Sequence, residues 1–368
     1  MTRTCCLVVN PAAGGGRAQR LLPVASRVLD EAGIQHEVCL CTSLEHAREL
    51  AVAAVGRGQI AVAVGGDGLV GALTGTVAGA GGLFGIIPSG RGNYFARTLG
   101  IPFTPDAAAR VIASGQEHRV DLIAVARAGS ATPANSDPAT PVSTDSPVPA
   151  SPDTATPDTA TPVSATPVSA TPVSADPLAL APDEVVVAGS VYLGIPAVAA
   201  EIAARATMPP GELAYPAAAL RAVAGWRTAT FHLELDGGPA EDLAAGPAVH
   251  QPVTREFAGG AVVVANSRYF GAGMMVAPSA DASDGLLDVI YIQGSSKLAM
   301  IHALTKIKKG THVSMRPIGT ARARQITVTV GRPMPGGADG EPLPCASPLA
   351  AGSPLRIRAL PGALRMII

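Results

Sequence analysis

The sequence predicts an α/β nucleotide-binding domain followed by a β-rich, sandwich-like second domain. Three observations carry this prediction. Short apolar runs alternate with helical patterns over residues 1–128, which is typical of a parallel sheet with helices on both faces. A low-complexity segment then interrupts the chain at residues 129–183. After it, apolar runs joined by turn residues dominate, as in an antiparallel sandwich or barrel.

The first domain is expected to alternate strictly between strands and helices. Its predicted strands are Cys5–Val9, His36–Leu40, Ile60–Val64, Leu83–Ile87 and Val120–Ala126. The helices expected between them cover roughly Gly16–Ala32, Leu44–Val55, Val70–Ala78 and Pro105–Ser114.

The insert consists mainly of Ala, Thr, Pro, Ser, Val and Asp, and ATPVS occurs three times in succession from Ala160 to Ser174. Prolines deny the backbone regular hydrogen bonds, and small side chains bury too little surface to offset the entropy of ordering. We therefore expect a disordered or polyproline-like spacer. A docking role for this tract is the alternative.

The second domain is expected at residues 184–349. Its apolar runs are Glu184–Ser190, Ala229–Leu235, Gly260–Ala265, Leu287–Ile292 and Gln325–Val330. Two stretches between them have helical patterns, namely Leu213–Ala224 and Lys297–Lys309.

Composition excludes several classes of protein. A net charge of −1 and 3% aromatic residues do not suit a nucleic-acid surface, so we expect no nucleic-acid partner. The five cysteines form neither CxxC pairs nor zinc-ligand patterns, which predicts reduced thiols. Because no leader pattern or long apolar run is present, we expect a cytoplasmic protein with only peripheral membrane contact.

Three predicted strands of the first domain end in glycine-rich exits. They are Asn10–Arg17 (NPAAGGGR), Gly65–Gly68 (GGDG) and Ile86–Arg97 (IIPSGRGNYFAR). A buried strand that ends in glycines brings backbone N–H groups to the sheet edge, where an α/β fold accepts nucleotide phosphates. One such turn is often only structural, but three in succession favour phosphate binding.

In this order and spacing the three exits resemble the diacylglycerol kinase catalytic domain family of lipid kinases, which includes sphingosine and ceramide kinases. The resemblance continues in GELAYPAAALRA at Gly211–Ala222, in the segment Val262–Ile292 that contains DGLLD, and in ADGEP at Ala338–Pro342. It implies two domains with the active site in the cleft between them. It also implies that the chain returns to the first domain near its end, at about residues 350–368.

The resemblance implies roles for particular residues. Glu341 would be the general base that accepts the proton of the lipid hydroxyl, with Asp339 beside it in the catalytic motif. From local sequence alone, Asp339-Gly340 is a hairpin turn with a solvated Glu341. The residues expected to bind ATP are Asn10, Thr42, Gly65, Gly66, Asp67, Gly68, Gly90, Arg91 and Asn93. Those expected to hold a structural Mg²⁺ are Asp281, Asp284 and the main chain of Leu286.

The chain also departs from the family pattern. Leu69 stands where the family has Thr, Gly71 where it has Asn, and Tyr94 ends a motif that usually ends in Asp. A phosphate donor is thereby lost at Leu69, and the guanidinium of Arg91 is the candidate replacement.

We therefore expect an ATP- and Mg²⁺-dependent kinase that phosphorylates a hydroxyl of diacylglycerol or of a sphingoid-like lipid at a membrane surface. A small cluster of lysines at Lys306, Lys308 and Lys309 suits either an anionic membrane or a solvated helix end. A homodimer is left open. The alternatives are a non-catalytic nucleotide- or lipid-binding protein on the same fold, and an NAD kinase, which also uses GGDG.

Overall fold

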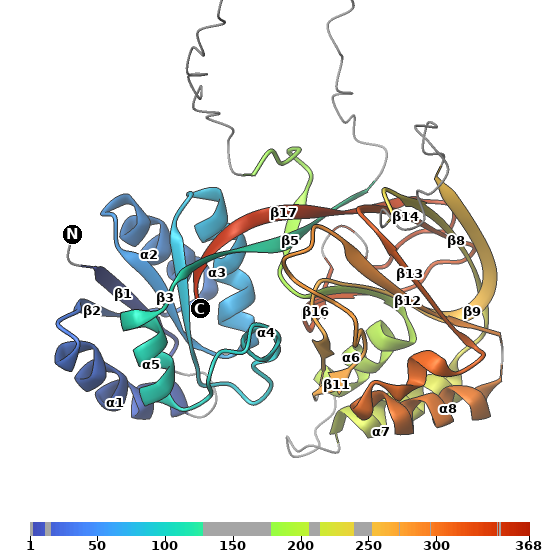
Figure 1. Cartoon of the computed structure of the whole chain (residues 1–368). Coiled ribbons are helices and arrows are strands. Elements are labelled where there is room, and N and C mark those ends of the chain that lie inside the picture. The colour runs from blue at the N-terminus through green and yellow to red at the C-terminus, as the bar shows by residue number, and fades with distance from the viewer. Residues whose placement is uncertain are drawn as a thin grey trace, which may run out of the picture. The chain divides into compact units, whose positions relative to one another are not determined.

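The computed structural model describes residues 3–11, 16–127, 178–205, 214–238, 252–271, 273–294, 296–343, 345 and 347–368. Most of the predicted spacer, the middle of the first glycine-rich exit and residues 211–213 lie outside these ranges. Within them the predicted fold class is confirmed, since an α/β half precedes a half rich in antiparallel strands (Figure 1).

The N-terminal half contains strands β1 to β5 and helices α1 to α5. The strands are β1 (Thr4–Val9), β2 (Gln35–Leu40), β3 (Ile60–Gly65), β4 (Leu83–Pro88) and β5 (Glu117–Arg127). The helices are α1 (Arg17–Glu31), α2 (Leu44–Gly56), α3 (Asp67–Gly79), α4 (Tyr94–Thr98) and α5 (Pro105–Ser114). Strands β2, β1, β3 and β4 pair in parallel in that order.

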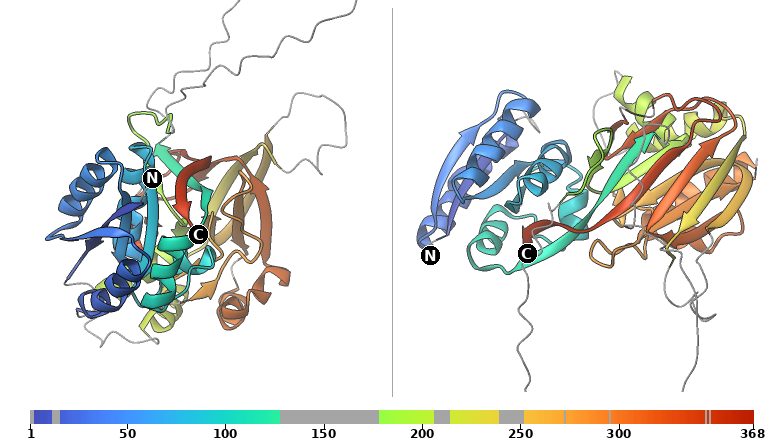
Figure 2. Two further views of the ribbon diagram at one scale, coloured as in Figure 1. Left: turned by 60° about the vertical axis from the view of Figure 1, so that its left-hand side comes forward. Right: turned by 90° about the horizontal axis from the view of Figure 1, so that it is seen from above.

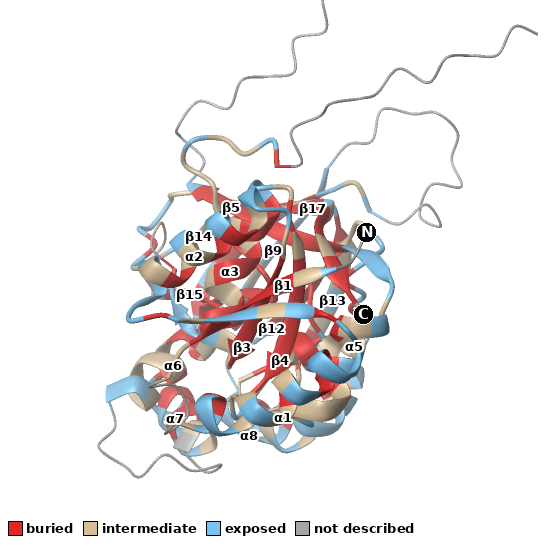
Figure 3. Ribbon diagram, turned by 90° about the vertical axis from the view of Figure 1, so that its left-hand side faces the viewer, coloured by how far each residue is buried: buried red, intermediate tan, exposed pale blue. Residues whose placement is uncertain are grey.

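Local chemistry explains the ends of these helices. Ser43 accepts a hydrogen bond from the backbone N–H of His46 and caps α2, while Pro105 occupies the first turn of α5. After α1, Gly33 adopts a φ of 71°, and the N–H groups of Gly33 and Ile34 return to carbonyls of the last turn. Strands β1, β3 and β4 are buried beneath the helices, whose outer faces are exposed (Figure 3).

The C-terminal half contains β6 (Val185–Val187), β7 (Ser190–Gly194), β8 (Ala229–Asp236), β9 (Val253–Ala265), β10 (Tyr269–Phe270), β11 (Met274–Met275), β12 (Leu287–Gln293), β13 (Ile318–Ala323), β14 (Gln325–Val330), β15 (Gly336–Ala338), β16 (Glu341–Pro342) and β17 (Leu355–Ile367). Its helices are α6 (Ile195–Arg205), α7 (Ala214–Gly225) and α8 (Lys297–Lys306), followed by the 3-10 turns η3 (Ile307–Lys309) and η4 (Thr311–Ser314).

Strand β17 joins the two halves in one continuous hydrogen-bonded sheet. Near its start it pairs antiparallel with β14, and at its end it pairs in parallel with β4. Antiparallel pairing with β5 accompanies it over most of its length, with an irregularity between Leu360 and Leu364 (Figure 2). The final strand therefore closes the parallel sheet that the first residues of the chain began.

The structure also differs from the predicted elements. The run Glu184–Ser190 divides into β6 and the start of β7, because the chain turns at Ala188 and Gly189, whose N–H groups bond to the Asp339 carboxylate. Helix α3 begins at Asp67 rather than Val70. Helix α6 was not predicted, because its alanine-rich sequence lacks a clear apolar stripe.

Candidate active site

The predicted nucleotide site forms at the carboxyl edge of the parallel strands. Val9 pairs with Leu40 and with Val64, and Gly65 pairs with Pro88. The segments that leave β1 to β4 therefore start at one edge of the sheet. They contain the predicted residues Asn10, Thr42, Gly66 and Gly90. This is the edge at which open α/β sheets bind their ligands.

The second and third glycine-rich exits touch through their backbones. A Cβ on Gly90 would lie 2.5 Å from the Cα of Gly66, which no side chain tolerates. The N–H of Ser89 donates to the carbonyl of Gly65 at 2.8 Å and holds the two exits together. Glycine is thus required at residue 90 for close approach.

Asp67 links these two exits through its carboxylate. Its Oδ2 accepts the N–H of Asn93 at 2.8 Å, and its Oδ1 accepts the N–H of Tyr94 at 2.6 Å. A Cβ on Gly92 would lie 2.4 Å from the Tyr94 ring and 2.7 Å from Oδ2, so a larger residue there would displace these two side chains. Burial raises the pKa of Asp67, although these backbone donors oppose the shift. In this arrangement Asp67 orders the loop in front of α4.

Asn93 reinforces the same loop. Its Oδ1 accepts the N–H of Gly90 at 2.9 Å, and its Nδ2 donates to the carbonyl of Gly90 at 3.0 Å. Its φ of 49° is the left-handed conformation that asparagine adopts more readily than most residues.

Asp339 approaches this edge from the C-terminal half. It occupies the turn between β15 and β16 with a φ of 48°. Its carboxylate accepts the N–H groups of Ala188 and Ser190 at 2.8 Å each and that of Gly189 at 3.0 Å. Burial raises its pKa to about 6 despite these donors, and the charge of Asp67 adds to the shift. Two carboxylates from distant parts of the chain thus interact electrostatically.

A cavity of about 460 Å³ brings these groups together. Its lining includes Asp67, Gly71 and Tyr94 from the N-terminal half and Ser267 and Asp339 from the C-terminal half. A Cβ on Gly71 would lie 3.9 Å from the Asp339 Oδ2, so the missing asparagine of the family pattern leaves space beside that carboxylate. Leu69 instead packs into the core against Gly65, with 3% of its surface exposed.

Other predicted residues lie outside this cavity. Glu341 is exposed and lines a neighbouring hollow with Tyr192 and Glu201, on the far side of Gly340. Thr42 is exposed and contacts the ring of His46 through its Oγ1 at 3.1 Å. Arg91 and Gly68 are also exposed. The cavity thus contains Asp339 of the predicted catalytic pair, and the role of Glu341 remains a prediction.

The predicted metal residues form a separate loop before β12. Asp281 accepts the N–H and the hydroxyl of Ser283, and Asp284 accepts the N–H of Leu286 and pairs with Arg322. Asp288, nearby, is 3% exposed, and its Oδ2 lies 3.5 Å from the Nε of Arg322 in an ion pair. Carboxylate oxygens are the donors that Mg²⁺ prefers, so this loop fits the ion chemically, with Arg322 as its competitor.

Sequence reasoning did not find Asp121, which anchors this loop. It is 2% exposed in β5, and its carboxylate accepts the N–H of Gly285 at 2.7 Å and that of Gly362 at 2.6 Å. Burial raises its pKa, and Asp281 and Asp284 raise it further. The available signal was a single carboxylate within the predicted strand Val120–Ala126, whose other residues are apolar.

A second cavity, of about 700 Å³, adjoins the first and shares Phe270 with it. Its lining is almost wholly apolar and comes from α6, α7, α8 and the strands beneath them; it includes Ile195, Ala199, Tyr215, Ala219, Val263, Met300 and Ile307. Sequence reasoning did not locate this cavity, because its residue types are those of an ordinary core.

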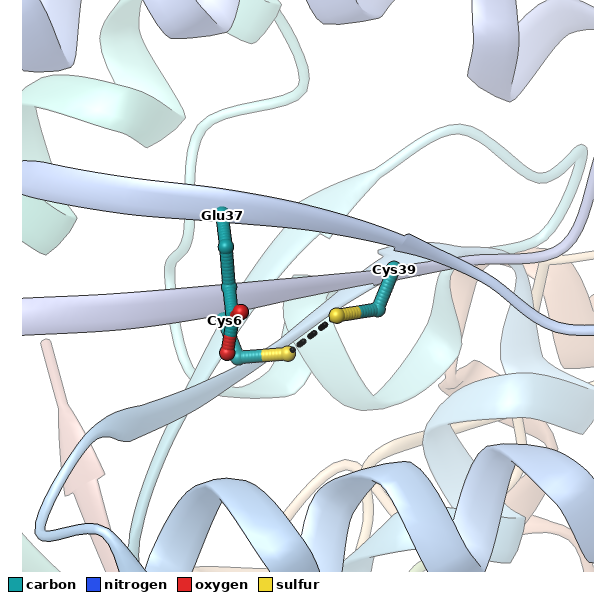
Figure 4. A group of neighbouring side chains, drawn as sticks. All are labelled: Cys6, Glu37 and Cys39. Atoms are coloured by element: carbon teal, nitrogen blue, oxygen red, sulfur yellow. Dashed lines mark hydrogen bonds between the residues drawn. The ribbon is translucent and has the colours of Figure 1, made fainter.

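A third group of reactive side chains lies away from both cavities. Cys6 on β1 converges with Glu37 and Cys39 on β2, and the Cys6 Sγ donates to the Cys39 Sγ at 3.1 Å (Figure 4). Glu37 is already paired with Arg57. Burial raises the pKa of Cys6, and the neighbouring Cys39 adds to the shift, so Cys6 is a protonated thiol at neutral pH.

Two family models match different parts of the chain. Residues 4–125 match the diacylglycerol kinase catalytic domain, and residues 189–368 match the YegS C-terminal NAD kinase beta sandwich-like domain. The fold matches a putative diacylglycerol kinase from Bacillus anthracis str. Sterne with a TM-score of 0.64 and 19% identity, covering 99% of this chain and 96% of that one. A second structure titled a diacylglycerol kinase, from the same strain, gives 0.61 and 16% over the same shares.

A curated relative is similar over nearly the full length. The chain is 28% identical to a diacylglycerol kinase of Mycobacterium tuberculosis (strain ATCC 25618 / H37Rv), covering 98% of this chain and 93% of the relative. The chain therefore belongs to the diacylglycerol kinase catalytic domain family.

Proposed function

We propose that this protein is an ATP-dependent lipid kinase that transfers the γ-phosphoryl group of ATP to a hydroxyl of diacylglycerol or of a sphingoid-like lipid. The observation that carries the proposal is the pair of adjoining cavities. One holds the Asp67 and Asp339 carboxylates, and the other is apolar and meets the first at Phe270. A lipid has a polar end with a hydroxyl group and apolar chains, which would match the carboxylate cavity and the apolar cavity respectively.

The donor side of the reaction needs groups that hold phosphates. The exits after β3 and β4 bring backbone N–H groups to one sheet edge, and glycines at residues 66 and 90 let these two exits pack against each other. Mg²⁺ bound with ATP would offset the charge on the transferring group. Asp67 holds these exits in place through Asn93 and Tyr94, so we assign it the ordering of the phosphate site.

On the acceptor side, the lipid hydroxyl oxygen attacks the γ-phosphorus, the bond to the β,γ-bridging oxygen breaks, and ADP leaves. The hydroxyl proton passes to a carboxylate. Family resemblance assigns this base to Glu341. Asp339 has both oxygens engaged by three backbone N–H groups, which suits a positioning role, because those bonds fix the β15–β16 turn that carries Glu341.

A structural Mg²⁺ would be held by Asp281, Asp284 and the carbonyl of Leu286. There it would neutralise a loop whose carboxylates already raise the pKa of Asp121. Because Asp121 binds both this loop and Gly362 before the end of β17, such an ion would stabilise the junction between the two halves. Among the described residues, no helix is both long and apolar enough to span a membrane.

The test is transfer of radiolabel from ATP in the presence of Mg²⁺ to diacylglycerol, sphingosine or NAD, each in neutral detergent micelles where the acceptor needs them. We expect label in a lipid, and its loss in Glu341→Gln and Asp67→Ala. Label in NAD alone would establish the NAD kinase alternative. No transfer to any acceptor, with ATP or lipid binding retained, would favour a non-catalytic binding protein, to which the Gly71 departure points.

A further inference from the structure

The basic residues of this chain are distributed unevenly. All of its lysines, Lys297, Lys306, Lys308 and Lys309, fall in α8 and η3, and every other cationic side chain outside the histidines is an arginine. Residues 289–338 contain no Asp or Glu, although the whole chain has a net charge of −1. One segment of an almost neutral protein is therefore strongly positive.

The same segment exposes apolar side chains. Leu298 on α8 is 80% exposed, and Ile301, one turn further along, is 36% exposed. Leu220 on the neighbouring helix α7 is 45% exposed. Helices α7 and α8 contact each other (Figure 1). The Lys297 Nζ donates to the carbonyl of Ala224 at the end of α7. We call the part of the molecule that carries Leu220, Leu298 and Ile301 together with the lysines of α8 and η3 the α7–α8 surface.

This surface lies over the apolar cavity. Opposite the exposed side chains of α8, Met300, Ala303 and Leu304 line the cavity, as do Ala219 and Val223 of α7. The two helices therefore separate the cavity from solvent on this side of the C-terminal half. A membrane placed against them would be next to the site proposed for lipid chains.

We propose that the α7–α8 surface docks on an anionic lipid bilayer, with Leu298 and Ile301 inserted at the interface and the lysines on the headgroups. Long lysine stems reach charged headgroups while exposed leucine and isoleucine enter the acyl boundary. The one acidic residue of the adjoining helix α6, Glu201, is paired with Arg205, so it offsets little of the charge. The inference deepens the proposed function, on which it rests for the identity of the lipid substrate.

The size of the effect follows from the charges. A basic residue close to an anionic membrane strengthens binding by roughly fivefold, so removing three should weaken it on the order of a hundredfold. The variant is Lys306→Gln/Lys308→Gln/Lys309→Gln. The matched control, Arg27→Gln/Arg48→Gln/Arg110→Gln, removes the same charge from exposed residues of α1, α2 and α5.

The experiment is co-sedimentation of the full chain with vesicles of phosphatidylcholine, with or without phosphatidylglycerol. We expect binding only with phosphatidylglycerol, a loss of about a hundredfold in the lysine variant, and a severalfold loss in Leu298→Ser. The arginine control should bind like the wild type. Equal loss in that control, equal binding to neutral vesicles, or no binding by the wild type would each overturn the docking surface.

A separate measurement distinguishes this proposal from the kinase assignment. In neutral micelles, label transfer to diacylglycerol should be the same for the wild type and the lysine variant, because micelles deliver the lipid without an anionic surface. If vesicle binding follows the lysines while no acceptor is phosphorylated, the docking surface stands and the kinase assignment fails. If transfer in micelles falls with the lysines, those residues act at the site itself and the docking proposal is wrong.

Discussion

Replacing Asp67 by asparagine tests whether its carboxylate orders the phosphate site. Each of its oxygens accepts a different backbone N–H, from Asn93 and from Tyr94. Asparagine keeps one acceptor and turns an amide donor toward the other N–H. One hydrogen bond to a charged acceptor, about 1.5–3 kcal/mol, is therefore lost. Relief of the buried charge, which raises the pKa of Asp67, offsets part of this loss.

The assay is hydrogen exchange of the backbone amides in residues 90–98, followed by mass spectrometry. A loss of about 1.5–3 kcal/mol corresponds to exchange faster by about tenfold to a hundredfold in this segment. Asp30→Asn is the control, because the Asp30 side chain is 71% exposed and distant in sequence from the exits. Unchanged exchange at residues 90–98 in Asp67→Asn, or an equal change in the control, would refute the ordering role.

Three further predictions follow from buried groups. Burial raises the pKa of Asp339 from 3.8 to about 6, so its ionised form destabilises the folded protein by about 3 kcal/mol above pH 6. This cost disappears as the pH falls toward 4. The free energy of unfolding in urea, measured relative to Asp339→Asn, should therefore rise for the wild type by that amount at low pH. Arg358→Met removes the two hydrogen bonds that Arg358 donates to the Glu184 carboxylate, which is 3% exposed and keeps the N–H of Ala181. The substitution should destabilise the fold by about 3–5 kcal/mol in urea, with much of the loss recovered when Glu184→Gln is added. Ala219→Leu fills part of the apolar cavity and should slow transfer to long-chain diacylglycerol severalfold while leaving the affinity for ATP unchanged; equal rates would argue against lipid in that cavity.

Much of the fold could be predicted because local patterns and tertiary structure agree there. The runs at β1, β3 and β4 are buried on both faces, as expected of central parallel strands, and the glycine-rich exits fall at their carboxyl ends. The strand β17 was not recognised, although the return of the last residues to the first domain was expected. Its thirteen residues mix arginines with apolar residues, because the strand runs from the antiparallel strands of the C-terminal half into the parallel sheet of the N-terminal half.

The sequence by itself determined the fold class and the family, and it predicted the glycine-rich exits of the proposed phosphate site. Gly66 and Asp67 directly follow β3, and Gly90, Gly92 and Asn93 directly follow the neighbouring parallel strand β4, so the expected strand order already brought the two groups to one sheet edge. Only the tertiary structure placed Asp339 beside Asp67 and Asp121 beneath the acidic loop. It alone formed the apolar cavity and showed that α8, the helix with Lys297 and Lys306, lines part of it. The physical reason is that these arrangements depend on contacts between strands and helices far apart in sequence, and the residues around an apolar side chain or a single aspartate do not show which distant segment it will meet.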